Sequence, residues 1–240
     1  MIRGWRNTPE GAARIAGYLR LAGLAQVEGH EHEVALAVGD FLEAMGEQVA
    51  IDDAESLYTY RVPMLSADGS CPAVDAMAPV PYDLTGILGG RSAQTTRRLA
   101  ILERLVERAQ ETTGSDWLGI YQRRANAAGE PVLVKLAYVG RPSRAEFPLT
   151  SEFATGSSNA TVGLTGRALV IDNVKRHVEA GGGFYVCDAD VQSEACLPLL
   201  DEARDVIGII DAEAKPAAFY GPARLATLAA LAIVAAAVLP

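Results

Sequence analysis

The stretch from residue 181 to residue 213 reads GGGFYVCDADVQSEACLPLLDEARDVIGIIDAE. Two apolar segments in it, 195–200 and 206–211, flank the polar turn 201–205, which is the pattern of two paired β-strands. Three glycines, two aromatic residues and Cys187 come before them. Because glycine adopts backbone conformations that other residues avoid and lets the chain approach a ligand closely, this loop can present Cys187 to a pocket. The alternative is that Cys187 is a small buried apolar residue, as most free cysteines are.

The segments on either side of this stretch extend the pattern to a whole domain. Residues 95–112 have the apolar spacing of an amphipathic helix, and 117–122 and 132–138 are strand-like runs joined by a polar turn. Two shorter strand candidates lie at 147–149 and 168–171, and the Ala-rich segment 225–239 predicts a buried terminal helix. The order helix, antiparallel strands, helix predicts an α+β fold whose sheet is covered by its terminal helices.

The first 92 residues have a different character. Two helices are predicted over 10–24 and 28–45, and an irregular connector rich in proline and glycine follows over 49–92, with a strand candidate at 57–62. We therefore expect a helical extension and connector over residues 1–92 and a second domain over residues 93–240.

Composition excludes several classes of function. The net charge of −9 argues against a nucleic-acid surface or a basic membrane patch. The apolar run 225–239 is shorter than the roughly 20 residues that a membrane-spanning helix needs. Three cysteines do not make a disulfide framework, and no signal peptide is recognisable, so a reducing cytoplasm is the expected location.

Several motifs of residues 94–240 carry a resemblance to a known family. They are 115–121 (SDWLGIY), 162–166 (VGLTG), 171–174 (IDNV), 184–188 (FYVCD), 192–199 with Gln-Ser-Glu and Leu-Pro-Leu, and 207–213 (IGIIDAE). This region resembles a GAF domain, and more narrowly the free methionine-(R)-sulfoxide reductases, which are single GAF domains. The spacing of seven residues from Cys187 to Glu194 is the most specific part of the match.

The resemblance implies a chemistry for these positions. Cys187 would be the nucleophile, the acidic residues Glu194, Asp211 and Glu213 would hold the substrate, and Trp117 and Tyr121 would wall the pocket. A thiolate attacks the sulfoxide sulfur, a protonated carboxyl donates to the departing oxygen, and the resulting sulfenic acid is reduced by a second thiol. Without the resemblance, both aromatic residues could be core, Glu194 a surface carboxylate and Asp211 a turn cap.

The family's thiol partners for the nucleophile are missing. Leu164 stands where one cysteine is expected, and none occurs at 144–147, where the resolving cysteine commonly lies. The intervening stretch 150–161 is longer and rich in Ser, Thr and Gly, which predicts a different lid. Two candidates for resolution remain: Cys196, which could point to the opposite face of its strand, and Cys71 in the connector.

Three hypotheses follow. The chain is a sulfoxide reductase reset by Cys71, Cys196, thioredoxin or glutathione; or a GAF sensor of an amino acid or related metabolite; or a redox sensor that oxidises at Cys187 without turnover. No cofactor is expected, and no metal site is expected at His30-Glu31-His32-Glu33, because His30 and His32 would point to different faces of a helix. A homodimer through the helix at 225–239 is also expected.

Overall fold

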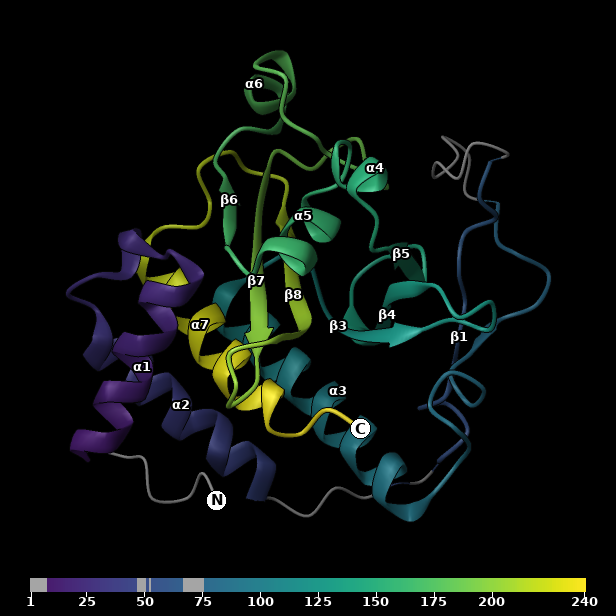
Figure 1. The fold of residues 1–240 in the computed structure, drawn as a ribbon, viewed down its shortest axis with the longest axis horizontal. Helices are drawn as coiled ribbons and strands as arrows, with labels where there is room; N and C mark the ends of the chain where they lie inside the picture. Colours follow the sequence, from purple (N-terminus) through teal and green to yellow (C-terminus); the bar gives the residue numbers. More distant parts are fainter. Residues whose placement is uncertain (1–7, 47–50, 52, 67–75) are drawn as a thin grey trace.

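The computed structural model describes residues 8–46, 51, 53–66 and 76–240, and Figure 1 shows its fold. Six strands form one antiparallel sheet in the order β5-β4-β3-β8-β7-β6. Their bounds are β3 (Trp117–Ala125), β4 (Pro131–Val139), β5 (Glu146–Pro148), β6 (Leu169–Ile171), β7 (Ser193–Leu200) and β8 (Val206–Ala214). The two strands predicted from the first stretch quoted above are β7 and β8, which pair as expected, and the α+β prediction is confirmed.

Helices cover one face of this sheet. Alternate residues of the long strands β3, β4, β7 and β8, such as Leu118 and Ile120 of β3 and Ile210 of β8, are buried in a core shared with α3 (Ala93–Thr113) and α7 (Pro222–Ala236). The helices α1 (Pro9–Ala22) and α2 (Glu31–Gly46), joined by the short helix η1 (Ala25–Val27), form a further layer that packs on α7 (Figure 1).

The terminal helix α7 is enclosed by its own chain. Ten of its 15 residues are buried, and it contacts α2, α3, β7 and β8. Its small side chains therefore serve close packing within the chain, while the predicted homodimer stays a prediction. Among the described helices, none combines the length and the apolar character needed to cross a membrane.

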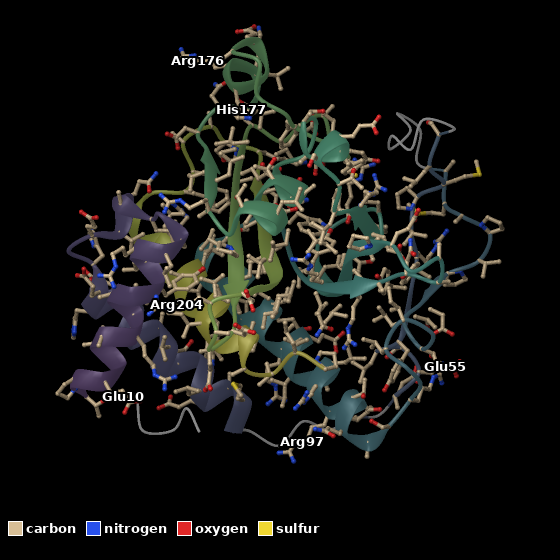
Figure 2. All side chains as sticks on the ribbon, in the orientation of Figure 1. Glu10, Glu55, Arg97, Arg176, His177 and Arg204 are labelled. Carbon is tan, nitrogen blue, oxygen red and sulfur yellow. The ribbon has the colours of Figure 1, made fainter. Side chains whose placement is uncertain are left out.

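Three short helices lie between β5 and β7, and none of them was expected from the sequence. They are α4 (Ser151–Ala154), α5 (Ser158–Thr165) and α6 (Val174–Glu179). The Ser- and Thr-rich stretch forms helices because its hydroxyls cap them: the side chain of Thr150 accepts from Phe153 N, and that of Ser157 from Ala160 N. Figure 2 places Arg176 and His177 on α6, at the end of the molecule away from α1.

The connector forms a small two-stranded sheet of β1 (Thr59–Tyr60) and β2 (Tyr82–Asp83), and a bridge between Pro63 and Met77 lies in the segment between these strands. Tyr58 and Leu84 are fully buried in the core beside α3. The connector thus packs beside β4, at the right of Figure 1, rather than trailing from the domain.

Candidate functional site

The second face of the sheet brings the predicted pocket residues together. Trp117, Glu213 and Glu194 are direct cross-strand neighbours on β3, β8 and β7. In the next row, Asp211 lies between Gly119 and Cys196. Directly paired residues project from the same face of a sheet, so three carboxyl groups converge beside Trp117. Glu194 is 1% exposed and Asp211 lies inside β8, so the surface and turn-cap alternatives for these two residues are wrong.

Gly119 allows the indole of Trp117 to lie flat over the sheet. A Cβ atom at position 119 would stand 2.4 Å from Cη2 of Trp117, which is far inside contact distance. The indole Nε1 donates to the carbonyl of Arg141 at 3.0 Å, and the ring lies 6.2 Å from that of Tyr121. Trp117 and Tyr121 therefore share one face, as expected from their spacing, and are held rigidly there.

Cys187 lies at a cavity of about 190 Å³. The lining includes Trp117, Arg141, Ser143, Cys187, Asp188 and Glu213. Cys187 is half-buried, and Arg141 forms an ion pair with Asp188 at 3.6 Å. One predicted carboxylate, one predicted aromatic residue and the predicted nucleophile thus share a cavity, and the carboxyl groups of Glu194 and Asp211 lie close to that of Glu213.

The glycines before Cys187 serve the packing of the protein itself. A Cβ on Gly182 would lie 2.2 Å from Nε2 of His177, and that ring nitrogen is 3.2 Å from the carbonyl oxygen of Gly183. The sequence indicated that these glycines let the chain approach a ligand closely. In the structure Gly182 instead lies close to His177 of α6. This contact fixes the path of the loop that carries Cys187.

The acidic cluster is held by α5. Carboxylate oxygens of Glu194, Asp211 and Glu213 lie within 4.8 Å of one another. Ser158 Oγ donates to Glu194 Oε1 at 2.6 Å, and Asn159 Nδ2 donates to Asp211 Oδ2 at 3.0 Å. Ser158 and Asn159 were not singled out in the sequence, because only the capped helix α5 brings this stretch onto the sheet.

The two deepest carboxyls both have raised pKa values. Glu194 Oε2 and Asp211 Oδ1 are buried and have no hydrogen-bond partner among the described residues. Burial raises the pKa of Glu194 well above its usual range, and neighbouring Asp211 and Glu213 raise it further. Burial also raises the pKa of Asp211, to about 6, although Asn159, Glu194 and Lys135 oppose this rise. The pKa of Glu213 is raised chiefly by burial and then by Asp211.

Lys135 is a buried cation beside this cluster that the sequence gave no signal for. Its side chain is fully buried, and Nζ donates to the carbonyl and the hydroxyl of Ser143 at 2.9 and 2.8 Å. Burial lowers its pKa to about 7, against an opposing effect of Asp211 and Glu213. The lysine thus partly balances the carboxylates electrostatically.

The cysteines differ sharply in their surroundings. Cys196 is a free, fully buried thiol on the same face as Asp211, so the expectation that it points away from the site is wrong. Its Sγ donates to Asn159 Oδ1 at 3.3 Å, and burial raises its pKa well above the usual range. Cys187 is disulfide-bonded. Cys71 lies outside the described residues.

The arrangement can hold a small cation. Three carboxyl groups this close favour an ammonium group or a metal ion over a neutral ligand. His30 lies elsewhere, at the start of α2, where Nδ1 is 3.4 Å from Glu33 on the exposed surface.

The GAF domain family model matches residues 97–239. No curated protein sequence matches the chain. A type II free methionine-R-sulfoxide reductase from Thermoplasma acidophilum is similar in structure, with a TM-score of 0.52 and 19% identity over 61% of this chain and 94% of that one.

Two further structures are similar at lower scores. The free methionine-R-sulfoxide reductase from Neisseria meningitidis, in complex with its substrate, has a TM-score of 0.47 and 19% identity over 59% of this chain and 79% of that one. The GAF domain of an Acinetobacter phosphoenolpyruvate-protein phosphotransferase has a TM-score of 0.47 and 16% identity over 59% and 81%.

Proposed function

This chain belongs to the GAF domain family, and we propose that it reduces free methionine-(R)-sulfoxide with Cys187 as the nucleophile. The observation that carries the proposal is that Cys187, Glu213 and Trp117 line one cavity of about 190 Å³. A free amino-acid sulfoxide offers an ammonium group to the carboxylates and a methyl group to the indole.

The acidic cluster favours an amino acid over a larger sulfoxide-bearing chain. Glu194 Oε2 and Asp211 Oδ1 are buried acceptors with no donor in the part of the chain that the structure describes, and the neighbouring Glu213 lines the cavity. Buried acceptors are stabilised when a donor reaches them, and a charged donor gives the strongest hydrogen bonds. A free α-ammonium supplies this donor, whereas the amide nitrogen of a methionine residue within a protein does not carry the charge.

The first chemical step is an oxygen transfer. The Cys187 thiol and the sulfoxide give a Cys187 sulfenic acid and a thioether: the S–O bond of the substrate breaks, an S–O bond to Cys187 forms, and two electrons pass from Cys187 to the substrate sulfur. As the thiolate attacks, a protonated carboxyl gives its proton to the oxygen, which restores the proton that the thiol lost. Glu194 is the group whose surroundings keep a proton available.

The second step needs another thiol, and Cys71 is the candidate we favour. Cys196 is free, wholly buried and has a raised pKa, which disfavours its thiolate. Of the three cysteines, Cys71 then remains as partner for Cys187. Attack of its thiol on the sulfenic acid forms a disulfide and releases water, and an external dithiol such as thioredoxin, or the thiol glutathione, reduces that disulfide.

Consumption of free methionine-(R)-sulfoxide with dithiothreitol or with a thioredoxin system tests this proposal. Wild type is expected to turn over with both, and Cys187→Ser with neither. Cys71→Ser should keep turnover with dithiothreitol, which reduces the sulfenic acid directly, and lose turnover with thioredoxin. Cys196→Ser is the matched control and should act as wild type does. Absence of turnover by a protein with reduced Cys187 would refute the proposal.

A second candidate is a sensor that binds an amino acid without turnover. It is favoured by the carboxylate cluster, whose capacity to hold an ammonium group does not depend on Cys187. Thermal stabilisation by free methionine or its sulfoxide that persists in Cys187→Ser, together with no turnover in wild type, would establish this function. A redox sensor would instead show oxidation of Cys187 by peroxide with no effect of the amino acid.

A further inference from the structure

An irregularity in β4 places two residues on the pocket face that a regular strand would separate. Lys135 pairs with Tyr121, and Tyr138 pairs with Gly119, with a shift of register between Ile120 and Tyr121. Residues three apart on a regular strand point to opposite faces. The bulge lets both Lys135 and Tyr138 project on the side of Trp117.

Three aromatic rings, which we call the aromatic box, surround the ammonium group of Lys135. Nζ lies 3.9 Å from the ring centroid of Tyr138, 5.0 Å from that of Tyr60 and 5.9 Å from that of Trp117. Distances within about 6 Å are those at which a cation is attracted by the ring face. Such boxes are typical of sites that bind ligand ammonium groups, and here the protein's own lysine fills it.

The box joins two parts of the chain that the sequence separates. Trp117 and Tyr138 belong to the sheet, and Tyr60 belongs to β1 of the connector. The hydroxyl of Tyr60 donates to the carbonyl of Lys135 at 2.7 Å, so the same residue is bound through both its backbone and its ammonium group. Tyr82 of β2 stacks on Tyr60 and donates a hydrogen bond to Glu146.

The other side of the box is the wall of the cavity. Ser143, which accepts both hydrogen bonds from Lys135 Nζ, lines the cavity, and so does Trp117. Trp117 in turn binds the carbonyl of Arg141 in the same loop. Loss of the ammonium group would therefore remove two hydrogen bonds from Ser143 and the cation contact from the ring of Tyr60 together.

We propose that Lys135 is a positioning residue. Its ammonium group binds Tyr60 of the connector and, at the same time, Ser143 and Trp117 of the cavity wall, and so holds the connector against the site. In this role the lysine acts as an internal ligand of the aromatic box. The proposal concerns the arrangement of Tyr60, Trp117 and the loop 141–143, and it holds whether the cavity supports turnover or binding alone.

Chemical rescue of Lys135→Ala, followed by backbone hydrogen exchange, tests this inference in the full-length chain. The substitution removes three methylene groups and the ammonium, which n-propylammonium replaces. We expect exchange at residues 57–62 and at the amides of Arg141 and Ser143 to quicken about tenfold, n-propylammonium to restore the slow exchange, and n-propanol, of nearly the same size, not to restore it. Exchange in α1 and α2 should stay unchanged.

Lys135→Met separates the effect of the positive charge from the effect of side-chain volume. It also provides the test if the alanine variant does not fold. Methionine fills most of the same volume without the positive charge. Exchange at residues 57–62 as slow as in wild type would overturn the proposal, because packing alone would then hold the connector. Equal rescue of Lys135→Ala by n-propanol and n-propylammonium would overturn it as well. Each readout is independent of activity, so failure of the proposed reaction leaves this test intact.

Discussion

Replacing Glu194 by glutamine tests the raised pKa of this carboxyl at the centre of the site. The amide has nearly the same shape, can accept from Ser158 Oγ through its oxygen, and can donate to Asp211 through its nitrogen. The variant should therefore fold with the same contacts. What it loses is the ability to take up and release a proton.

The magnitude follows from linkage between protonation and folding. Burial and the neighbouring carboxylates hold the pKa of Glu194 well above its usual 4.5 in the folded state. Above the usual carboxyl pKa the unfolded chain releases this proton, while the folded protein keeps it until the pH reaches the raised pKa of Glu194. A raised carboxyl pKa stabilises at low pH, so stability falls as pH rises through this window, by up to about 1.4 kcal/mol per pH unit for one proton. Wild type should therefore lose stability more steeply than Glu194→Gln as pH rises above about 5.

Urea unfolding at pH 5, 6 and 7 measures this difference. Lys135, whose folded pKa is about 7, is present in both proteins, so its titration largely cancels from the comparison. Glu202→Gln, at an exposed position on the turn after β7, is the control and should follow the wild-type slope. Parallel slopes for wild type and Glu194→Gln would refute the raised pKa of Glu194.

Three further changes probe the packing around the site. Gly119→Ala places a Cβ 2.4 Å from Trp117, so we expect the free energy of unfolding in urea to fall by about 1–3 kcal/mol. Free methionine should also bind more weakly by calorimetry. Unchanged binding would contradict the role of the indole as a wall of the cavity. Asn159→Ala leaves Asp211 Oδ2 without its donor and should cost about 1–3 kcal/mol of unfolding free energy, and a neutral effect would show that water replaces the amide. Deletion of residues 1–46 uncovers α7 and should raise the association state above that of the intact chain in sedimentation measurements. An unchanged association state would show that α2 is dispensable as a cover.

The strand pairs and long helices could be predicted because their signals are local. Alternating apolar residues identified β7 and β8, and the period of α3 identified a helix with one apolar face. The positions of Glu194, Asp211 and Glu213 followed from their spacing on adjacent strands and from the family resemblance. Period 2 in a strand places residues on a face reliably.

The remaining parts of the site depend on contacts that spacing does not encode. α5 reaches the sheet because Ser157 caps it, and only then do Ser158 and Asn159 meet the carboxyls. Lys135 faces the site because a bulge shifts the register of β4. Cys196 was expected to point away, although residues 194 and 196 on one strand share a face; the alternation rule applied to Glu194 would have placed it correctly.

A single-turnover experiment tests the central claim most directly. Chain reduced beforehand and freed of reductant is mixed with excess free methionine-(R)-sulfoxide, and the methionine formed is counted against oxidation at Cys187 by mass spectrometry. The proposed reaction predicts about one methionine per chain, matched by loss of the Cys187 thiol, and none from Cys187→Ser. Bound sulfoxide with no methionine formed and Cys187 still reduced would contradict it.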